Sequence, residues 1–207
     1  MEAGVDPLRL AKADPEEQRA FLINAVLADP VNAAVLERAY QLGLPDHALM
    51  AGSLYKSVWN ELTGREPGHG VNDYDLAYFD DSDLGQEAED AVIRRCEPVF
   101  ADLPAEVEVC NQARVHIWFS KKFGVKRDPL VDTADAVRHF ASKTHAVALR
   151  WSAPGDMDVI APFGLDALFS LRVEPMPGVA NPEGWNSKIA EQARLWPEIE
   201  FISAESP

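Results

Sequence analysis

The sequence predicts a single α/β domain, in the broader α+β sense, in which a small mixed β-sheet is covered by helices. Short apolar segments that suit buried strands alternate with longer segments in which apolar residues recur at helical spacing. The length of 207 residues suffices for a substantial core and corresponds to one domain. Within this single domain, residues 1–207, we expect a core at 44–124, a helical N-terminal part at 1–43 and a C-terminal α/β extension at 125–207.

Two helices are predicted before the core. Asp14-Pro15 indicates a helix start, because Asp is a favoured N-cap and Pro suits the first helical position. Asp29-Pro30 repeats this signal, and Gly43 ends the second helix, as glycine commonly does. Apolar residues at helical spacing follow each start, so both helices are expected to pack against the sheet.

The core begins with a short apolar strand at residues 47–51, a Gly52-Ser53 turn and a helix that Gly64 ends. Glycine allows the backbone to pass close to a ligand, and the free N–H groups at a helix N-terminus favour a phosphate. Gly52 and Ser53 are therefore candidate phosphate-binding residues. Lys56, one turn further along the helix, is another candidate because it lies close to Ser53.

A second strand, which ends at Phe79, carries a pair of carboxylates. Residues two apart in a strand point to the same face, so Asp73 and Asp75 can hold a divalent cation between them. An Asp-x-Asp pattern alone is weak evidence in so acidic a chain, which contains it again at 81–83 and 156–158. The order of strand, Gly-Ser turn, helix and second strand is what distinguishes this pair.

A helix at residues 85–100 is expected to lead into a third strand at 105–109. Glu106 and Glu108 lie on the same face of that strand, and a shift of register by one residue would move both to the other face. The residues from Asn111 onward fit either a continued strand or a helix capped by that asparagine, and we choose the helix.

The C-terminal extension is expected to add further α/β elements, since both helical and strand periodicities recur there. The final helix is expected to stop at the proline that follows it. The expected elements are a helix at 133–143, a strand at 145–151, a segment at 156–160 that is either a short strand or the approach to one, a turn into a short helix at 163–169, and a final helix at 186–196.

The composition limits the partners that we expect. The chain has 19 Lys and Arg against 34 Asp and Glu, a formal net charge of −15. An acidic surface repels polyphosphate backbones, so general nucleic-acid binding is not expected, although a small nucleotide can enter together with Mg²⁺. Cys96 and Cys110 form no CxxC pair, and we see neither a secretion signal nor a bilayer-spanning segment. We therefore expect reduced thiols, a cytoplasmic location and no membrane partner.

The pattern Ala51-Gly52-Ser53, intervening helix, Asp73-Tyr74-Asp75 resembles the signature of the nucleotidyltransferase superfamily that includes DNA polymerase beta. Five segments are also similar to a family of bacterial nucleotidyltransferase-like proteins with largely undefined substrates: SLYKSVWNELTGR, NDYDLAYFD, EVCNQARVHIWF, FGLDALF and RLWP. This resemblance covers most of the chain and implies a nucleotidyltransferase-like fold. The interval between Ser53 and Asp73 is longer than in many superfamily members, which gives the loop around His69 room to cover the site. His69 itself is either a mobile ligand or an ordinary exposed loop histidine, and we expect the latter.

The resemblance implies a third carboxylate on a neighbouring strand. Glu108, just before CNQARVH, is our choice, and Glu106 remains the alternative. Three facing acids require cations, since their mutual repulsion would otherwise raise their pKa values. Oxygen ligands and a phosphate substrate favour Mg²⁺ or Mn²⁺. Asp73 and Asp75 would bridge two such ions, and Glu108 would bind the ion that activates the acceptor hydroxyl.

The implied activity is transfer of a nucleoside monophosphate from an NTP to a hydroxyl of an unidentified small-molecule or protein acceptor. Gly52, Ser53, Lys56 and Arg114 are the candidate nucleotide-binding residues, although a surface ion pair explains Arg114 equally well. The alternative is a catalytically silent nucleotide-binding or interaction protein that retains the fold. Three facing acids favour the enzyme, because a silent protein has little physical reason to keep them. Further candidate contacts, each explained equally well as a surface or helix-face charge, are His116, Lys188 and Arg194.

Overall fold

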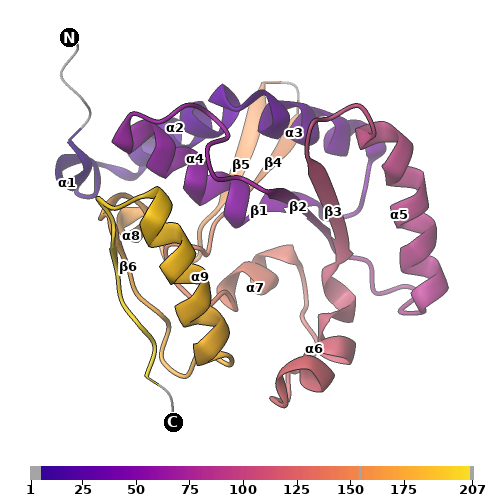
Figure 1. The fold of residues 1–207 in the computed structure, drawn as a ribbon. Coiled ribbons are helices and arrows are strands. Elements are labelled where there is room, and N and C mark those ends of the chain that lie inside the picture. Colours follow the sequence, from indigo (N-terminus) through magenta and orange to yellow (C-terminus); the bar gives the residue numbers. More distant parts are fainter. Residues whose placement is uncertain (1–5, 154, 206–207) are drawn as a thin grey trace.

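The computed structural model describes residues 6–153 and 155–205 and has the mixed α/β architecture that the sequence predicts (Figure 1). Its main sheet has the strand order β3-β2-β1-β4-β5, in which β2 and β3 are parallel and every other neighbouring pair is antiparallel. Two very short strands, β6 and β7, form a separate parallel pair. The strands are β1 (Ala48–Met50), β2 (Asp73–Tyr78), β3 (Glu106–Asn111), β4 (Ala148–Ala153), β5 (Asp156–Ile160), β6 (Arg172–Val173) and β7 (Glu200–Phe201).

Helices lie on both sides of the sheet. Figure 1 shows α2, α3 and α4 above it and α6, α7 and α9 below it, with α5 beside the edge strand β3. The helices are α1 (Pro7–Leu10), α2 (Pro15–Ala28), α3 (Pro30–Leu42), α4 (Gly52–Thr63), α5 (Gln86–Phe100), the 3-10 turn η1 (Gln112–Arg114), α6 (Val115–Phe123), α7 (Thr133–Arg138), α8 (Asp166–Phe169) and α9 (Pro182–Leu195).

The helix starts that the sequence predicts at Asp14 and Asp29 are confirmed. The Asp14 carboxylate accepts hydrogen bonds from two backbone N–H groups of α2, and the Asp29 carboxylate accepts one from α3. Asp29 is also buried and accepts a hydrogen bond of 2.7 Å from the Tyr74 hydroxyl, so this cap ties α3 to β2. The additional helix α1 was not predicted, because four residues are too few for a helical periodicity to show.

The choice of a helix after the third strand is confirmed, although β3 extends to Asn111 and the 3-10 turn η1 precedes α6. The Asn111 side chain accepts hydrogen bonds from the backbone N–H groups of Ala113 and Asp80. Asn111 therefore caps η1 and fixes the point at which the chain leaves the sheet. Gly124 ends α6 in a left-handed conformation with φ of 68°.

The C-terminal elements differ from the prediction in their bounds. The helix expected at 133–143 ends at Arg138, and the strand expected from His145 begins at Ala148. His145 is instead fully buried in front of the strand, where its ring stacks on Tyr55 with centroids 4.3 Å apart. Apolar residues in this turn-rich segment are buried by tertiary packing, so their spacing imitates helix and strand periodicity. The segment at 156–160 is a strand, β5.

The last helix, α9, begins at Pro182, earlier than the expected start at residue 186. Asn181 caps it by accepting a hydrogen bond from the Gly184 backbone N–H, and Pro182 occupies the first turn. One buried apolar cluster extends from Leu10 to Ala204. The division of the chain into three parts stays a prediction.

Two features bear on the expected location and redox state. Cys96 is buried, Cys110 is half-buried and both are free thiols. Within the described residues no single helix is long and apolar enough to cross a membrane; α2 and α3, bent by 100°, satisfy those criteria only when taken together.

The glycine-rich loop at residues 66–72 joins α4 to the C-terminal end of α9. The Asn60 side chain donates a hydrogen bond to the His69 backbone carbonyl and accepts one from Trp196 Nε1. The His69 ring packs edge-on against the Trp196 ring, with centroids 5.6 Å apart. His69 is half-buried, so the expectation that it is an exposed loop histidine is wrong.

Gly70→Ala is expected to destabilise the protein by about 3 kcal/mol, since it combines a positive φ with a steric clash. Gly70 has φ of 69°, and a Cβ there would lie 2.5 Å from Trp196 Cη2, an atom of a fully buried ring. Gly68→Ala is the matched control, because its φ is 79° but the nearest atom, Asp29 Oδ2, would be 3.6 Å away. Urea unfolding followed by tryptophan fluorescence measures both, and equal losses would contradict the proposed clash.

Candidate functional site

A ladder of four carboxylates lies on one face of the paired strands β2 and β3. The parallel register places Asp73 opposite Glu106 and Asp75 opposite Glu108. Residues paired in a sheet share a face, so all four side chains leave it on the same side. Asp75 and Glu108 line the cavity described below, whereas Asp73 and Glu106 do not. The charge of Glu108, unlike that of Glu106, contributes to the raised pKa of Asp75, so Glu108 stays our choice for the third carboxylate.

Asp75 is the carboxylate most affected by its surroundings. Burial, with the negative charges of Asp73 and Glu108, raises the pKa of Asp75 to about 6, and the positive charges of Lys188 and Lys56 act in the opposite direction. A cation that approaches an acid with a raised pKa stabilises the ionised form of that acid. The carboxylate ladder therefore has unneutralised negative charge to offer to a ligand.

The pKa of Asp75 predicts a specific loss of stability as the pH rises. Between pH 3.8 and about 6 the folded state keeps a proton that the unfolded state has released, so the free energy of unfolding falls with rising pH. The difference corresponds to about 3 kcal/mol once both states are ionised. Asp75→Asn removes this dependence, so we expect its stability advantage over the parent protein to grow by about 2 kcal/mol between pH 4.5 and pH 7.5.

Urea unfolding of both proteins in the presence of EDTA measures this effect. EDTA is needed because a bound divalent cation would compensate the repulsion between the acids. A stability difference between Asp75→Asn and the parent protein that does not change with pH would contradict the prediction.

The N-terminus of α4 is directed at the carboxylate ladder. The chain turns from β1 into the helix at Ala51, whose φ of 55° is a conformation that few residues other than glycine adopt. No side chain caps this helix. A Cβ at Gly52 would lie only 3.9 Å from Asp75 Oδ2. The first turn of the helix therefore approaches the carboxylates closely, as expected from the Gly52-Ser53 turn.

Ser53 adds an unused hydrogen-bonding group to this turn. Its side chain is fully buried, and its hydroxyl oxygen has no hydrogen-bond partner within the described part of the chain. A buried hydroxyl without a partner costs free energy, so a ligand that accepts its hydrogen bond would be favoured. Free N–H groups and an unsatisfied hydroxyl at a helix N-terminus together fit an anion such as a phosphate.

Two lysines flank the same region. Lys56 on α4 is 9% exposed, and burial lowers its pKa, while Asp73 raises it. Lys188 on α9 lines the cavity together with Asp75 and Glu108. In residues 6–153 and 155–205 neither ammonium group has a carboxylate within 4.0 Å. Both charges are therefore available to an anionic ligand.

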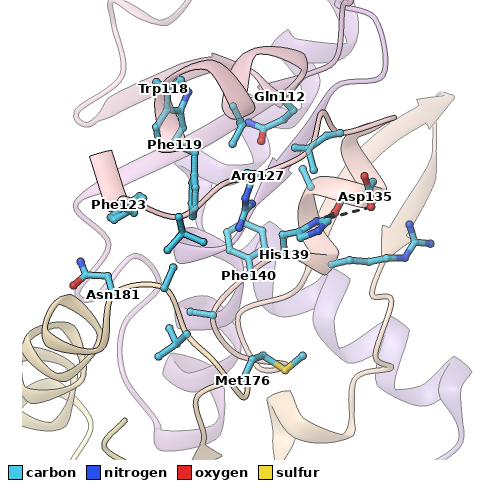
Figure 2. A pocket seen from close by; sticks show the side chains of 18 of the residues that line it. Gln112, Trp118, Phe119, Phe123, Arg127, Asp135, His139, Phe140, Met176 and Asn181 are labelled. Carbon is cyan, nitrogen blue, oxygen red and sulfur yellow. Dashed lines mark hydrogen bonds and ion pairs between the residues drawn. The ribbon is translucent and has the colours of Figure 1, made fainter. Parts of the chain in front are cut away.

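A cavity of about 980 Å³ opens on this face of the sheet, and Figure 2 shows part of its wall. The strands contribute Asp75 and Glu108, α9 contributes Trp185 and Lys188, and α6 with the segment after it forms the remaining wall. This volume lies at the upper end of the range for small-molecule sites, which is about 300–1,000 Å³. There is room for a nucleotide and part of a second molecule.

Of the residues considered from sequence, Asp75, Glu108 and Lys188 line this cavity. The others do not: Gly52, Ser53, Lys56, His69, Asp73, Glu106, Arg114, His116 and Arg194. Arg114 is buried and forms an ion pair with Glu89, and its guanidinium also donates to the Leu84 carbonyl at 3.0 Å and to Gln86 Oε1 at 2.8 Å. These contacts join η1 to the start of α5, and the ion pair is the alternative explanation of Arg114 that the sequence left open. The loop that carries His69 packs against Trp196 and does not line the cavity, so the expectation that it covers the site is wrong.

The spacing and the chemistry of these carboxylates bear on whether they could bind a divalent cation. In the part of the chain that the structure describes, no three His, Cys, Asp or Glu side chains lie close enough together to form a metal site. The chemistry of the donors nevertheless fits Mg²⁺ or Mn²⁺, which prefer carboxylate oxygens. Burial and the charges of Asp73 and Glu108 raise the pKa of Asp75, and a bound cation would stabilise its ionised form.

A mixed sheet with paired acids next to an uncapped helix N-terminus is the arrangement that the resemblance to nucleotidyltransferases implies. The model of a protein family described as nucleotidyltransferase matches residues 37–201, so this chain belongs to that nucleotidyltransferase family. No curated protein matches the chain.

A solved structure supports the same fold. Its title states that "The NMR structure of the protein reveals a CCA-adding enzyme head domain", and it superimposes with a TM-score of 0.71 at 23% sequence identity. The alignment covers 88% of this chain and 95% of that one. The similarity confirms the nucleotidyltransferase-like fold that the sequence motifs imply.

Proposed function

We propose that the protein is a divalent-metal-dependent enzyme that transfers a nucleoside monophosphate from an NTP to a hydroxyl group. The observation that carries this proposal is the position of Asp73, Asp75 and Glu108 on one sheet face, next to the uncapped N-terminus of α4. The acceptor oxygen forms a bond to the α-phosphorus as the bond from that phosphorus to the oxygen of the β-phosphate breaks. Pyrophosphate leaves, and Glu108 takes the proton of the acceptor hydroxyl.

The chain supplies separate groups for each part of the nucleotide. The first N–H groups of α4 and the Ser53 hydroxyl hold the triphosphate, since they have donors without acceptors. Lys56 and Lys188 neutralise its negative charge. Asp73, Asp75 and Glu108 would hold Mg²⁺ or Mn²⁺, which when bound stabilises charge on the attacking and leaving oxygens.

The alternative is a catalytically silent protein that binds nucleotides or partners with the same fold. The carboxylate ladder argues against it, because the burial and the neighbouring acids that raise the pKa of Asp75 cost stability without metal. A silent protein would gain stability by losing one of these acids. The enzyme is therefore the better explanation of the site.

Binding of an NTP together with Mg²⁺ or Mn²⁺ tests the proposal directly. A ligand at 100 times its Kd stabilises the folded state by about 2.7 kcal/mol, which for a chain of this length raises Tm by about 5–10 °C. We expect such a shift with at least one of the four NTPs and no shift when EDTA replaces the metal. Release of pyrophosphate by the same mixture then separates an enzyme from a silent binder.

A Tm that no NTP raises with either metal would contradict nucleotide binding altogether. Ser53→Ala is expected to reduce the shift, because it removes the buried hydroxyl without changing the charge of the site. Asp81→Asn, an exposed acid from another Asp-x-Asp pair, is the control that should leave the shift unchanged.

A further inference from the structure

The cavity has two ends that differ in chemistry. The α9 end carries Lys188 and lies toward the proposed triphosphate site of α4, since the charges of Lys188 and Lys56 affect each other. The α6 end is formed by Trp118, Phe119, Phe123 and Arg127. Figure 1 shows α6 and α9 on opposite sides beneath the sheet, with α7 between them. Only the short turn η1 separates α6 from β3, so the α6 end belongs to the side of the site where Glu108 stands.

Arg127 is an unpaired cation in the wall of the α6 end. Its guanidinium stacks on Phe119, with its central carbon 3.8 Å from the ring centroid. Figure 2 shows Phe119, Arg127 and Phe140 gathered in the same wall. Arg127 is half-buried. Among the residues that the structure describes, its guanidinium donates no hydrogen bond and has no carboxylate within 4.0 Å. Its planar fork of donors is thus held in place but unused.

Asp135, the acid whose charge acts on Arg127, already has other partners. Asp135 raises the pKa of Arg127, against the larger opposing effect of burial. The Asp135 carboxylate accepts a hydrogen bond from the Val131 backbone N–H and lies 3.8 Å from His139 Nδ1, a contact that Figure 2 marks. Asp135 therefore leaves the donors of Arg127 free for an anionic group from outside the protein.

The cavity wall near the α6 end carries both signs of charge. Lys126 and Arg127 line it together with the acids Asp128 and Asp135, and Lys126 lies 3.7 Å from Asp128. Lys122 lies over the faces of Trp118 and Phe123 at 5.7 and 5.4 Å from their centroids. The α6 end thus combines the guanidinium of Arg127 with aromatic faces, which suits a ligand that has both an anionic group and a planar ring.

We propose that the α6 end is the acceptor subsite of the enzyme and that the acceptor carries an anionic group, phosphate or carboxylate, beside a planar ring. This inference rests on the proposed function, because it assigns the second substrate of that reaction. Arg127 binds the anionic group with its two-pronged donor set, and the ring lies against the aromatic wall. The acceptor hydroxyl then points toward Glu108, which takes its proton as the new bond to phosphorus forms.

Binding to a protein already loaded with nucleotide tests the subsite. The full chain is saturated with Mg²⁺ and an NTP analogue in which a methylene group replaces the oxygen between the α- and β-phosphates. Calorimetry then measures the affinity for adenosine 5′-monophosphate, adenosine and 4-hydroxybenzoate. We expect at least one of the two anionic compounds to bind tenfold or more tightly than adenosine. Preference for the monophosphate identifies phosphate as the recognised group, and preference for the benzoate identifies carboxylate.

Arg127→Gln is expected to weaken binding of the preferred anionic compound at least tenfold, about 1.4 kcal/mol, without changing the affinity for adenosine or for the analogue. Arg127→Lys keeps the positive charge but lacks the two-pronged donor set of the guanidinium. It replaces Arg127→Gln in this measurement if the glutamine variant is unstable. Lys121→Gln removes an exposed charge from the same helix and should leave all affinities unchanged. The subsite is refuted if neither anionic compound outperforms adenosine, or if Arg127→Gln weakens the analogue instead.

If the proposed function itself is wrong, the measurement gives a different result from the two that refute the subsite. In that case the parent protein would not bind the analogue with Mg²⁺ at all. The same three compounds are then measured on the unloaded protein, where loss of anion binding in Arg127→Gln still supports an anion site at the α6 end and unchanged binding refutes it.

Discussion

Asp75→Asn is expected to reduce metal-dependent nucleotidyl transfer by at least about 10²–10³-fold, the loss typical when one electrostatic stabiliser of a transition state is removed. Asp75 pairs with Glu108 across the two strands and shares a strand face with Asp73, so its loss removes the acid that neighbours both of the others. Pyrophosphate release with saturating NTP and Mg²⁺ measures the change. The parent protein and the variant are compared at the same concentration and pH.

The loss of activity should be accompanied by a gain of stability in the absence of metal. Asparagine occupies nearly the same volume as aspartate but carries no charge. It thus removes the buried charge, and its repulsion with Asp73 and Glu108, that together raise the pKa of Asp75 to about 6. Unfolding therefore cannot account for the inactivity. Asp81→Asn is the matched control and should retain full activity, because Asp81 is exposed and lies in the segment after β2, outside the paired strands that form the ladder. Equal turnover in Asp75→Asn and the parent protein would refute the assigned site.

Arg114→Met is expected to destabilise the fold by about 3–5 kcal/mol, because it leaves Glu89 as a buried charge without its partner. The two side chains are only 9% and 12% exposed, and Glu89 also accepts a hydrogen bond of 2.9 Å from the Asn111 backbone N–H. The pair thus joins α5 to the end of β3. Urea unfolding measures the loss.

A double variant separates the ion pair from simple loss of packing. Arg114→Met combined with Glu89→Leu is expected to recover much of the stability, since apolar residues often replace a buried pair at little cost. Arg95→Met on the exposed side of α5 is the control and should change stability by less than about 0.5 kcal/mol. If Arg114→Met instead left stability intact and weakened binding of NTP, Arg114 would be a nucleotide ligand after all.

Local signals in the sequence predicted the part of the fold that precedes Asn111 well. The caps at Asp14 and Asp29 and the left-handed glycines at Gly43 and Gly64 act within a few residues of the chain. The alternation of Asp73 and Asp75 likewise fixes which face of a strand they share, whatever lies around it. Such features are readable because the interactions that cause them are short in sequence.

The bounds of α7 and β4 could not be read in the same way. His145 was placed at the start of a strand, but it is buried between α4 and α9, against Tyr55 and Trp185. Burial at such a position depends on which helices meet there, and residues far apart in sequence decide it. Periodicity therefore misled the prediction only where tertiary packing, instead of secondary structure, buries the apolar residues.

The sequence by itself determined that a carboxylate pair follows a Gly-Ser turn and a helix, and hence the class of chemistry for which this chain is suited. Only the tertiary structure decided which other residues join them. It brings Lys188 from α9 to Asp75, ties Arg114 to Glu89 and leaves Arg127 unpaired beside Phe119. The physical reason is that a strand fixes the direction of its own side chains, whereas a cation remains free or becomes paired according to the acids that distant segments place within its reach.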